Sequence, residues 1–250
     1  MSQNRSLNAM RPAGAGAVMQ QRATRVVAAD NAQRAQWRAL DFFPTPPWAA
    51  RAGAELVKRL DPEAQTVWEP ACGEGHMAHG LRDVFDPTKV IATDIHNYTD
   101  NPTWDFLSDK RLPLDGVHWI VTNPPFLKAA EFAQRGLEVA ARGVAVLCRA
   151  AFLESAGRYP LLFQGPHPLT AMAPFIERVP MQLGVWDPQG STATAYAWFL
   201  FDKKAAPGSP VILPIPPGTR ARLTKDDDAA RFGAQLAWPL FQGESDAIHA

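Results

Sequence analysis

One stretch decides the fold of this chain: Thr66-Val67-Trp68-Glu69-Pro70-Ala71-Cys72-Gly73-Glu74-Gly75. Its first four residues predict a short buried strand, and its two glycines predict a tight loop that leads into a helix. A helix that begins just after a strand presents unpaired backbone N–H groups, and glycines allow a ligand to approach that backbone. The third glycine of a dinucleotide fingerprint is missing, and Glu69 and Glu74 would repel a pyrophosphate. The loop therefore favours a ligand with a cationic end, such as an ammonium or a sulfonium.

Strands and helices alternate on both sides of this loop. The hydrophobic pattern predicts helices over residues 47–60, 76–85 and 128–141. It predicts strands over residues 66–69, 89–94, 104–107, 118–122, 143–148 and 193–202. Several of these strands are apolar along their whole length, as strands buried on both faces are. The pattern therefore predicts an α/β fold built on an open parallel sheet.

The composition of the chain excludes several classes of protein. The 250 residues are 46% hydrophobic, which is enough for a core and excludes global disorder. The 25 basic residues balance the 25 acidic residues, so no overall field draws the chain to nucleic acid or to a membrane. No apolar run is long enough to span a membrane. Cys72 and Cys148 are too few for a paired-cysteine metal site, so we expect no metal, reduced thiols and a cytoplasmic location.

The chain divides into three predicted parts. Residues 1–40 carry six arginines against the single acid Asp30, and they predict a basic, flexible arm with a helix within residues 24–40. This arm is either a solvated tail or a segment that contacts phosphates. Residues 41–203 form the expected catalytic domain. Residues 204–250 form an expected proline-rich extension with one helix over residues 224–238.

Two acidic residues follow the glycine loop at successive strand ends. Asp94 comes about 20 residues after the loop, where an acid that binds a ribose belongs. Asp105 is placed to accept a hydrogen bond from an adenine amino group, and Phe106 beside it can flank the ring. Either acid alone fits an ordinary helix cap or loop residue. Together they favour a nucleoside site.

The tetrapeptide Asn123-Pro124-Pro125-Phe126 forms a rigid corner after the strand predicted over residues 118–122. Two successive prolines remove two backbone donors and fix two φ angles. This rigidity aims the side-chain oxygen of Asn123 and the carbonyl of Pro124 at one point, which suits an –NH2 group. Phe126 offers a stacking face for a planar ring. We interpret the corner as a holder for an exocyclic amine or an amide; the alternative is a plain proline turn.

In this order, the loop, Asp94, the pair Asp105-Phe106 and the NPPF corner resemble class I S-adenosylmethionine-dependent amino-methyltransferases. The resemblance is to phage and bacterial DNA adenine-N6 methyltransferases of the γ motif order. The segment Asp41-Phe42-Phe43-Pro44-Thr45-Pro46-Pro47-Trp48 is similar to the one that closes over the methionine part of the cofactor in those enzymes. The resemblance covers residues 41–203. It implies a Rossmann-like fold, with helices on both faces of a mostly parallel, seven-stranded sheet.

The resemblance also implies the site. The cofactor would be S-adenosyl-L-methionine, bound by Phe43, Pro44, Thr45, Glu69, Ala71, Gly73, Gly75, Asp94, Asp105, Phe106 and Asn123. The catalytic residues would be Asn123, Pro124, Pro125 and Phe126. A duplex base would have to flip out of its stack to reach them.

These observations predict methyl transfer to an exocyclic amine of a base in DNA. Adenine N6 is the favoured target, and cytosine N4 is the alternative. RNA adenine methylation remains an alternative, because RNA enzymes share the corner. Protein-glutamine methylation is a second alternative, although its corner is usually NPPY. A third is a catalytically silent relative that binds nucleic acid. The expected partner is DNA, with no membrane and no metal; the recognition sequence and the oligomeric state stay open.

Overall fold

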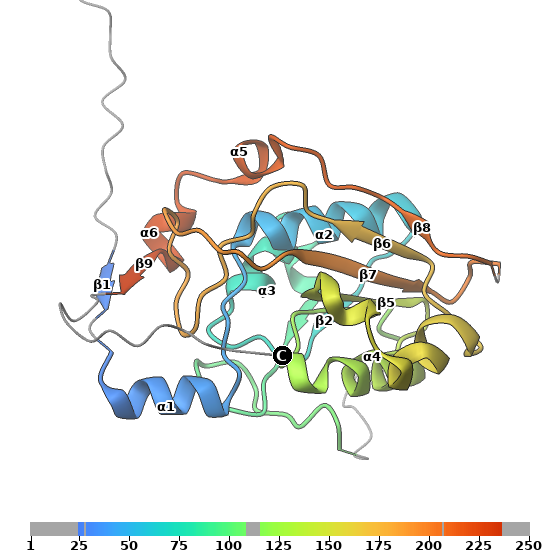
Figure 1. Cartoon of the computed structure of the whole chain (residues 1–250), viewed down its shortest axis with the longest axis horizontal. Helices are drawn as coiled ribbons and strands as arrows, with labels where there is room; N and C mark the ends of the chain where they lie inside the picture. Colours follow the sequence, from blue (N-terminus) through green and yellow to red (C-terminus); the bar gives the residue numbers. More distant parts are fainter. Residues whose placement is uncertain (1–24, 28, 109–115, 207, 237–250) are drawn as a thin grey trace, which may run out of the picture.

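The computed structural model describes residues 25–27, 29–108, 116–206 and 208–236, and these form one seven-stranded sheet with a small two-stranded sheet beside it (Figure 1). The strand order of the large sheet is β3-β2-β4-β5-β7-β6-β8. Its strands are β2 (Val67–Glu69), β3 (Val90–Ala92), β4 (Trp119–Thr122), β5 (Gly143–Arg149), β6 (Ala171–Pro174), β7 (Tyr196–Asp202) and β8 (Val211–Ile212). Only β7 runs antiparallel to its neighbours, β5 and β6. The predicted seven-stranded, mostly parallel sheet is confirmed.

Helices cover both faces of this sheet, as the sequence predicted. The helices α2 (Pro47–Leu60) and α3 (His76–Arg82) lie on one face, and α4 (Ala129–Val139) lies on the other (Figure 1). Successive strand residues point to opposite faces, so β5 places Ala145 and Leu147 in the core under α2, while Val144 and Val146 pack toward α4. Short turns of helix complete the layers: η1 (Pro87–Lys89), η2 (Phe126–Lys128), η3 (Ala150–Leu153), η4 (Ala156–Arg158) and η5 (Pro160–Gln164).

Two of the predicted elements differ from the structure. The strand predicted over residues 104–107 is wrong, because the chain makes only a single β-bridge between Asp94 and Thr103 and then turns. The segment stays attached through the Trp104 N–H, which donates to the Asp94 carbonyl at 2.7 Å. The helix predicted over residues 76–85 ends at Arg82, and its last residues form a turn.

The segment after Lys203 packs on the body of the molecule. It contributes β8 to the large sheet, α5 (Thr219–Leu223) against α2, and then α6 (Asp228–Phe232) and β9 (Ala234–Leu236). Of the helix predicted over residues 224–238, the structure has the five residues of α6, and residues 234–236 form the strand β9 instead. Asp228 is fully buried and accepts two hydrogen bonds from the Arg51 guanidinium, at 2.6 and 2.7 Å. This ion pair ties α6 to α2.

The described part of the N-terminal arm is also folded. Its strand β1 (Arg25–Val27) pairs in parallel with β9, and its helix α1 (Asn31–Ala39) lies within the range predicted for a helix. Trp37 on α1 is buried against Gly184, where an added Cβ would clash with the indole ring. Residues 1–24, which carry the rest of the predicted arm, lie outside the described residues. No helix in the described part of the chain is long and apolar enough to cross a membrane.

Candidate active site

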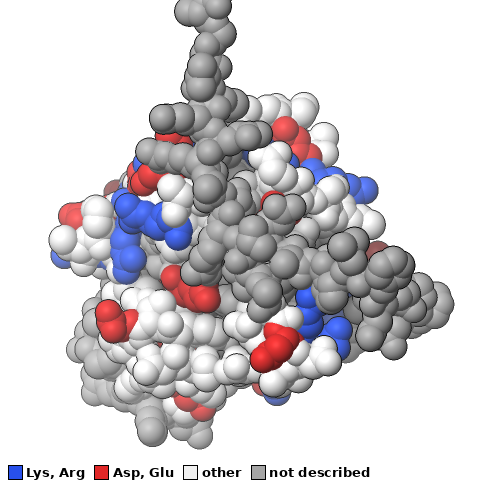
Figure 2. All heavy atoms as spheres, turned by 90° about the vertical axis from the view of Figure 1, so that its left-hand side faces the viewer, with Lys and Arg blue, Asp and Glu red and all other residues white. Residues whose placement is uncertain are grey.

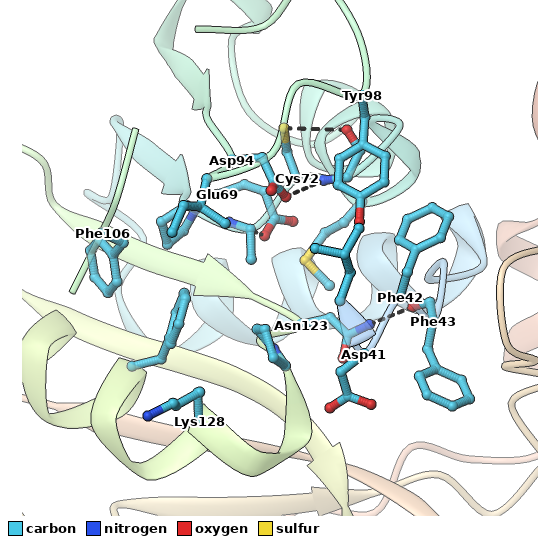
Figure 3. A pocket seen from close by; sticks show the side chains of 18 of the residues that line it. Asp41, Phe42, Phe43, Glu69, Cys72, Asp94, Tyr98, Phe106, Asn123 and Lys128 are labelled. Atoms are coloured by element: carbon cyan, nitrogen blue, oxygen red, sulfur yellow. Dashed lines mark hydrogen bonds between the residues drawn. The ribbon is translucent and has the colours of Figure 1, made fainter. Parts of the chain in front are cut away.

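The carboxyl ends of β2, β3 and β4 meet at one edge of the sheet, and a cavity of about 230 Å³ opens there (Figure 3). Ligands of open α/β sheets bind at this edge, because the loops that follow the parallel strands all lie there. Most of the residues predicted for the site line this cavity: Phe43, Pro44, Thr45, Glu69, Ala71, Gly73, Asp94, Asp105, Phe106, Asn123 and Pro125. Gly75, Pro124 and Phe126 are not among its lining residues.

The cavity also has lining residues that the sequence did not single out. Among them are Leu40, Asp41, Phe42, Tyr98, Trp104, Lys128 and Phe132. Asp41 and Phe42 stand in the segment that resembles the cofactor-closing segment, so their position was a usable signal. Nothing in the sequence around Tyr98 or Phe132 signals a site, because tertiary packing brings them there.

The glycine loop approaches the cavity closely at Gly73. Its φ of 51° lies in the left-handed region, and an added Cβ would lie 2.6 Å from the Phe42 ring. The Gly73 N–H donates to an Asp94 carboxylate oxygen at 2.8 Å, so the loop is held by the acid that follows β3. Gly75 also has a positive φ, at 91°, but it caps α3 and an added Cβ there would meet nothing within 4 Å. The two glycines therefore have different roles.

Glu69 ends β2 at the bottom of the cavity and is fully buried. One of its carboxyl oxygens accepts from the Thr122 hydroxyl at 2.7 Å and from the Ala71 N–H at 3.4 Å. The other oxygen is buried and has no hydrogen-bond partner among the described residues. Burial, with a smaller contribution from Asp94, raises the pKa of Glu69 to about 8. A cationic group in the cavity would favour its ionised form.

The two predicted nucleoside acids differ in their surroundings. Asp94 is largely enclosed, and burial raises its pKa even though the N–H groups of Gly73 and His96 donate to its two oxygens at 2.8 Å. Asp105 is exposed at the far end of the cavity, where it accepts from the Leu107 N–H at 3.1 Å. Phe106 beside it is buried against Trp68, edge to face at 5.0 Å. An acid and an apolar ring therefore lie together at that end.

The roof of the cavity comes from the chain after α1. Phe42 stacks on Tyr98 with ring centroids 4.7 Å apart and an interplanar angle of 25°. Burial raises the pKa of Tyr98 and that of the Cys72 thiol, which lines the cavity below, so both groups stay protonated near neutral pH. In the described part of the chain, no three His, Cys, Asp or Glu side chains cluster in a way that would hold a metal.

The proline corner presents one free acceptor. The Asn123 side-chain nitrogen donates to the Phe43 carbonyl at 2.8 Å, which fixes the amide plane (Figure 3). The Asn123 side-chain oxygen is buried and has no hydrogen-bond partner among the described residues. A buried acceptor without a partner is costly, and most buried polar groups in folded proteins are paired. The corner is therefore prepared to accept a hydrogen bond from a donor that enters the cavity.

Phe126 lies beside the corner and is partly buried. The Phe43 ring packs against it with centroids 5.3 Å apart, and the Arg149 guanidinium lies over it, 4.8 Å from the ring centre. The stacking surface predicted at Phe126 is therefore covered by a side chain that a planar ligand would have to displace. Around the site, the face at the carboxyl ends of the parallel strands carries described residues of both charges without a patch of one sign (Figure 2).

No protein-family model matches the chain, and no curated protein matches it. Among solved structures, a Pyrococcus horikoshii protein provisionally described as an RNA methyltransferase is similar, with a TM-score of 0.51 and 16% identity over 67% of this chain and 88% of that protein. A provisionally described type I restriction enzyme modification subunit from Vibrio vulnificus YJ016 has a TM-score of 0.46 and 18% identity, over 75% of this chain and 51% of the subunit. The type I restriction-modification methyltransferase subunit from Streptococcus thermophilus has a TM-score of 0.46 and 10% identity, over 68% of this chain and 48% of the subunit.

This chain spans about half the length of those two restriction-system subunits. At 16% identity, the likeness to the Pyrococcus horikoshii protein establishes the fold alone. The chain has the Rossmann-like fold of class I methyltransferases, and the predicted fold class is confirmed.

Proposed function

We propose that this chain is an S-adenosylmethionine-dependent methyltransferase that methylates an exocyclic amine of a base in DNA, with adenine N6 as the favoured target. The observation that carries the proposal is the buried, unpartnered oxygen of Asn123, fixed at the end of β4 beside the cavity. A preorganised acceptor at this place suits an amine that becomes more acidic as it reacts. The fold, the cavity and the resemblance of the NPPF corner support the same reaction.

The residues around the cavity fit the proposed cofactor. Glu69 offers a buried carboxyl oxygen without a partner to an ammonium or sulfonium, and Gly73 lets the loop backbone pack closely against the Phe42 ring. Asp94 lines the cavity after β3 and would bind the ribose hydroxyls. Asp105 and Phe106 would hold the adenine at the far end of the cavity. When bound, S-adenosylmethionine supplies an electrophilic methyl group on a sulfonium. Phe43, Pro44 and Thr45 would close over its methionine part.

The corner would make the target amine reactive. The lone pair of an aromatic amine is delocalised into its ring, so the amine is a poor nucleophile. Acceptance of its N–H bonds by the Asn123 oxygen and the Pro124 carbonyl favours a pyramidal nitrogen, whose lone pair then points at the methyl group. Much of the rate gain in such a reaction comes from this positioning. The methylated amine is acidic enough to lose its proton to solvent, so no strong general base is required.

The choice of DNA rests on the sequence. The segment with Phe43, Pro44 and Thr45 resembles that of DNA adenine methyltransferases, and residues 1–24 carry Arg5, Arg11 and Arg22 without an acid. A target base in a duplex would flip into the site, which costs a few kcal/mol of stacking and pairing. We also propose a cytoplasmic location, because both cysteines are free, buried thiols.

The test is methyl transfer from labelled S-adenosylmethionine to DNA, to RNA of the same sequence and to a protein extract, with nucleosides identified by mass spectrometry. We expect N6-methyladenine in DNA, and no transfer by the Asn123→Ala variant. N4-methylcytosine would keep the reaction and change the base. Preferred transfer to RNA or to glutamine would overturn the choice of DNA. Cofactor binding without any transfer would indicate a silent relative.

A further inference from the structure

Asp41 has an unusual backbone conformation at the edge of the site. Its φ is 50°, and it is the only residue other than glycine with a positive φ in the described part of the chain. It follows α1 directly and lines the cavity. Aspartate is one of the few residues other than glycine that adopt this conformation, and here it belongs to the turn that ends α1: the Asp41 N–H donates to the Arg38 carbonyl at 3.2 Å and the Phe42 N–H to the Trp37 carbonyl at 2.9 Å. This turn brings the side chain of Asp41 to the cavity.

The side chain of Asp41 holds the proline corner. One of its carboxylate oxygens accepts a hydrogen bond from the Phe126 N–H. Pro124 and Pro125 have no N–H, so Phe126 carries the first backbone donor after Asn123. The bond to Asp41 therefore uses the first backbone N–H that the corner has available after Asn123.

A second bond joins the same two segments, and the corner is again the donor. The Asn123 side chain donates to the Phe43 carbonyl, two residues after Asp41. The corner thus gives a backbone donor to the side chain of Asp41 and a side-chain donor to the backbone of Phe43. Asp41 and Asn123 lie near each other in Figure 3, on the same side of the cavity. Together the two bonds set the direction of the free Asn123 oxygen.

Asp41 forms no ion pair with the described residues, so its contact with Phe126 is its main attachment. The contact reaches across 85 residues of sequence, from the end of α1 to the end of β4. It connects the segment that roofs the cavity to the corner that would hold the target.

We propose that Asp41 is a positioning residue for the target amine: through the Phe126 N–H it holds the corner so that the Asn123 oxygen and the Pro124 carbonyl converge. The inference rests on the proposed function, because it assigns Asp41 to the turnover of that site. Asp41 does not touch the reacting atoms in this scheme. Its hydrogen-bond acceptor is what matters, and its charge is not.

Two variants separate the acceptor from the backbone conformation. Asp41→Asn keeps a side-chain oxygen, and asparagine tolerates a positive φ. Asp41→Gly adopts the same φ without strain but has no acceptor. We expect Asp41→Gly to lower kcat by roughly 10- to 100-fold, because misplacement by about 1 Å can cost about 100-fold in rate. We expect Asp41→Asn to keep kcat within about threefold, and both variants to keep their affinity for S-adenosylhomocysteine and their KM for DNA.

Hydrogen exchange at the Phe126 amide gives a readout that does not depend on activity. We expect this amide to be protected in the parent chain and in Asp41→Asn, and to exchange at least tenfold faster in Asp41→Gly. Equal exchange in all three chains would show that Asp41 does not hold the corner. An Asp41→Gly variant with parental kcat would overturn the positioning role, and an Asp41→Asn variant as slow as Asp41→Gly would assign the effect to charge.

The two proposals fail in different ways. A parent chain that binds S-adenosylhomocysteine but methylates none of the tested substrates overturns the proposed function and the kinetic part of this inference. The exchange measurement still decides, in that case, whether Asp41 fixes the corner.

Discussion

The Asn123 amide nitrogen is bound to the Phe43 carbonyl at 2.8 Å, which leaves the Asn123 oxygen as the free end of the side chain. This bond decides which end of the amide faces the cavity. A donor on the target therefore finds an acceptor already in place, and the amide need not turn during the reaction.

Asn123→Ala removes that acceptor, and we expect kcat to fall by about 10²–10³, as the loss of one preorganised group does at comparable sites. The affinity for S-adenosylhomocysteine should change little, because Glu69, Gly73 and Asp94 on the far side of the cavity are untouched. Single-turnover methyl transfer and calorimetry, run in parallel, measure the two quantities. Transfer at the parental rate would reduce the NPPF corner to a turn.

Glu69 should make the stability of the ligand-free chain depend on pH. Burial raises the pKa of Glu69 to about 8 from an ordinary value of 4.5. Between these values the folded chain keeps a proton that the unfolded chain releases, so the free energy of unfolding should decrease as the pH rises from about 4.5 and level off above about 8. Glu69→Gln keeps an oxygen for the Thr122 hydroxyl and should flatten this decrease. Urea unfolding at four pH values compares the two chains, and identical slopes would contradict the shifted pKa.

Gly73→Ala and Gly75→Ala form a matched pair. Both replace a glycine with positive φ, but only the Cβ at residue 73 meets another group, the Phe42 ring at 2.6 Å. We expect Gly75→Ala to cost about 1 kcal/mol in stability from backbone strain, and Gly73→Ala to cost more and also to weaken S-adenosylhomocysteine binding. Phe42→Ala should relieve part of the added cost in a double-mutant cycle. Equal losses at the two positions would show that the Phe42 contact is unimportant.

Phe126→Ala should act on the target and spare the cofactor. Base stacking on an aromatic ring contributes about 1–3 kcal/mol, so we expect the KM for DNA to rise by roughly one to two orders of magnitude. Phe126→Trp should be milder, because a stacking surface remains. Cofactor affinity is the control, since Phe126 does not line the cavity. An unchanged KM in Phe126→Ala would mean that the base does not displace Arg149 and stacks elsewhere.

Removal of residues 1–24 tests the basic arm and keeps every described residue. A longer deletion that included Trp37 would also remove a buried anchor of α1. The three arginines in residues 1–24 would each release counterions on phosphate binding, so the slope of log affinity against log salt should become shallower by at most about 3. Filter binding at four salt concentrations measures the slope. If it does not change, the arm does not contact phosphates.

The sequence predicted those parts of the fold that carry strong local patterns. The apolar run of β5 and the proline at the start of α2 predicted their elements closely, because burial and the φ of proline act within a few residues. The strands β6 and β8 were not predicted. Ala171 and Met172 become strand residues because β7 supplies their partners, and Val211 becomes one because it pairs with Ala171 of β6, 40 residues earlier in the sequence. The strand predicted around Asp105 failed for the same reason, since it found no partner beyond one bridge.

The residues of the site also divide into those with a local sequence pattern and those placed by distant contacts. Residues in the glycine loop and the NPPF corner were predictable, because their backbone chemistry is local. The position of Tyr98 was not predictable, and neither was the contact of Asp41 with Phe126, since only the folded chain brings Tyr98 to Phe42 and Asp41 to Phe126. The cover of Arg149 over the Phe126 ring was also not predictable, because Arg149 comes from the end of β5.

The buried pair between Arg51 and Asp228 sets a limit on how this protein can be shortened or fused. The Arg51 side chain is 2% exposed and lies on α2, the helix that directly follows the segment with Phe43 and Thr45. A chain cut after Lys203 would remove Asp228 and the Leu223 carbonyl from the Arg51 guanidinium, and Asp83 would remain as its carboxylate partner. Residues 204–236 are thus a structural part of the folded unit, and a domain swap or a minimal version for crystallisation should keep them.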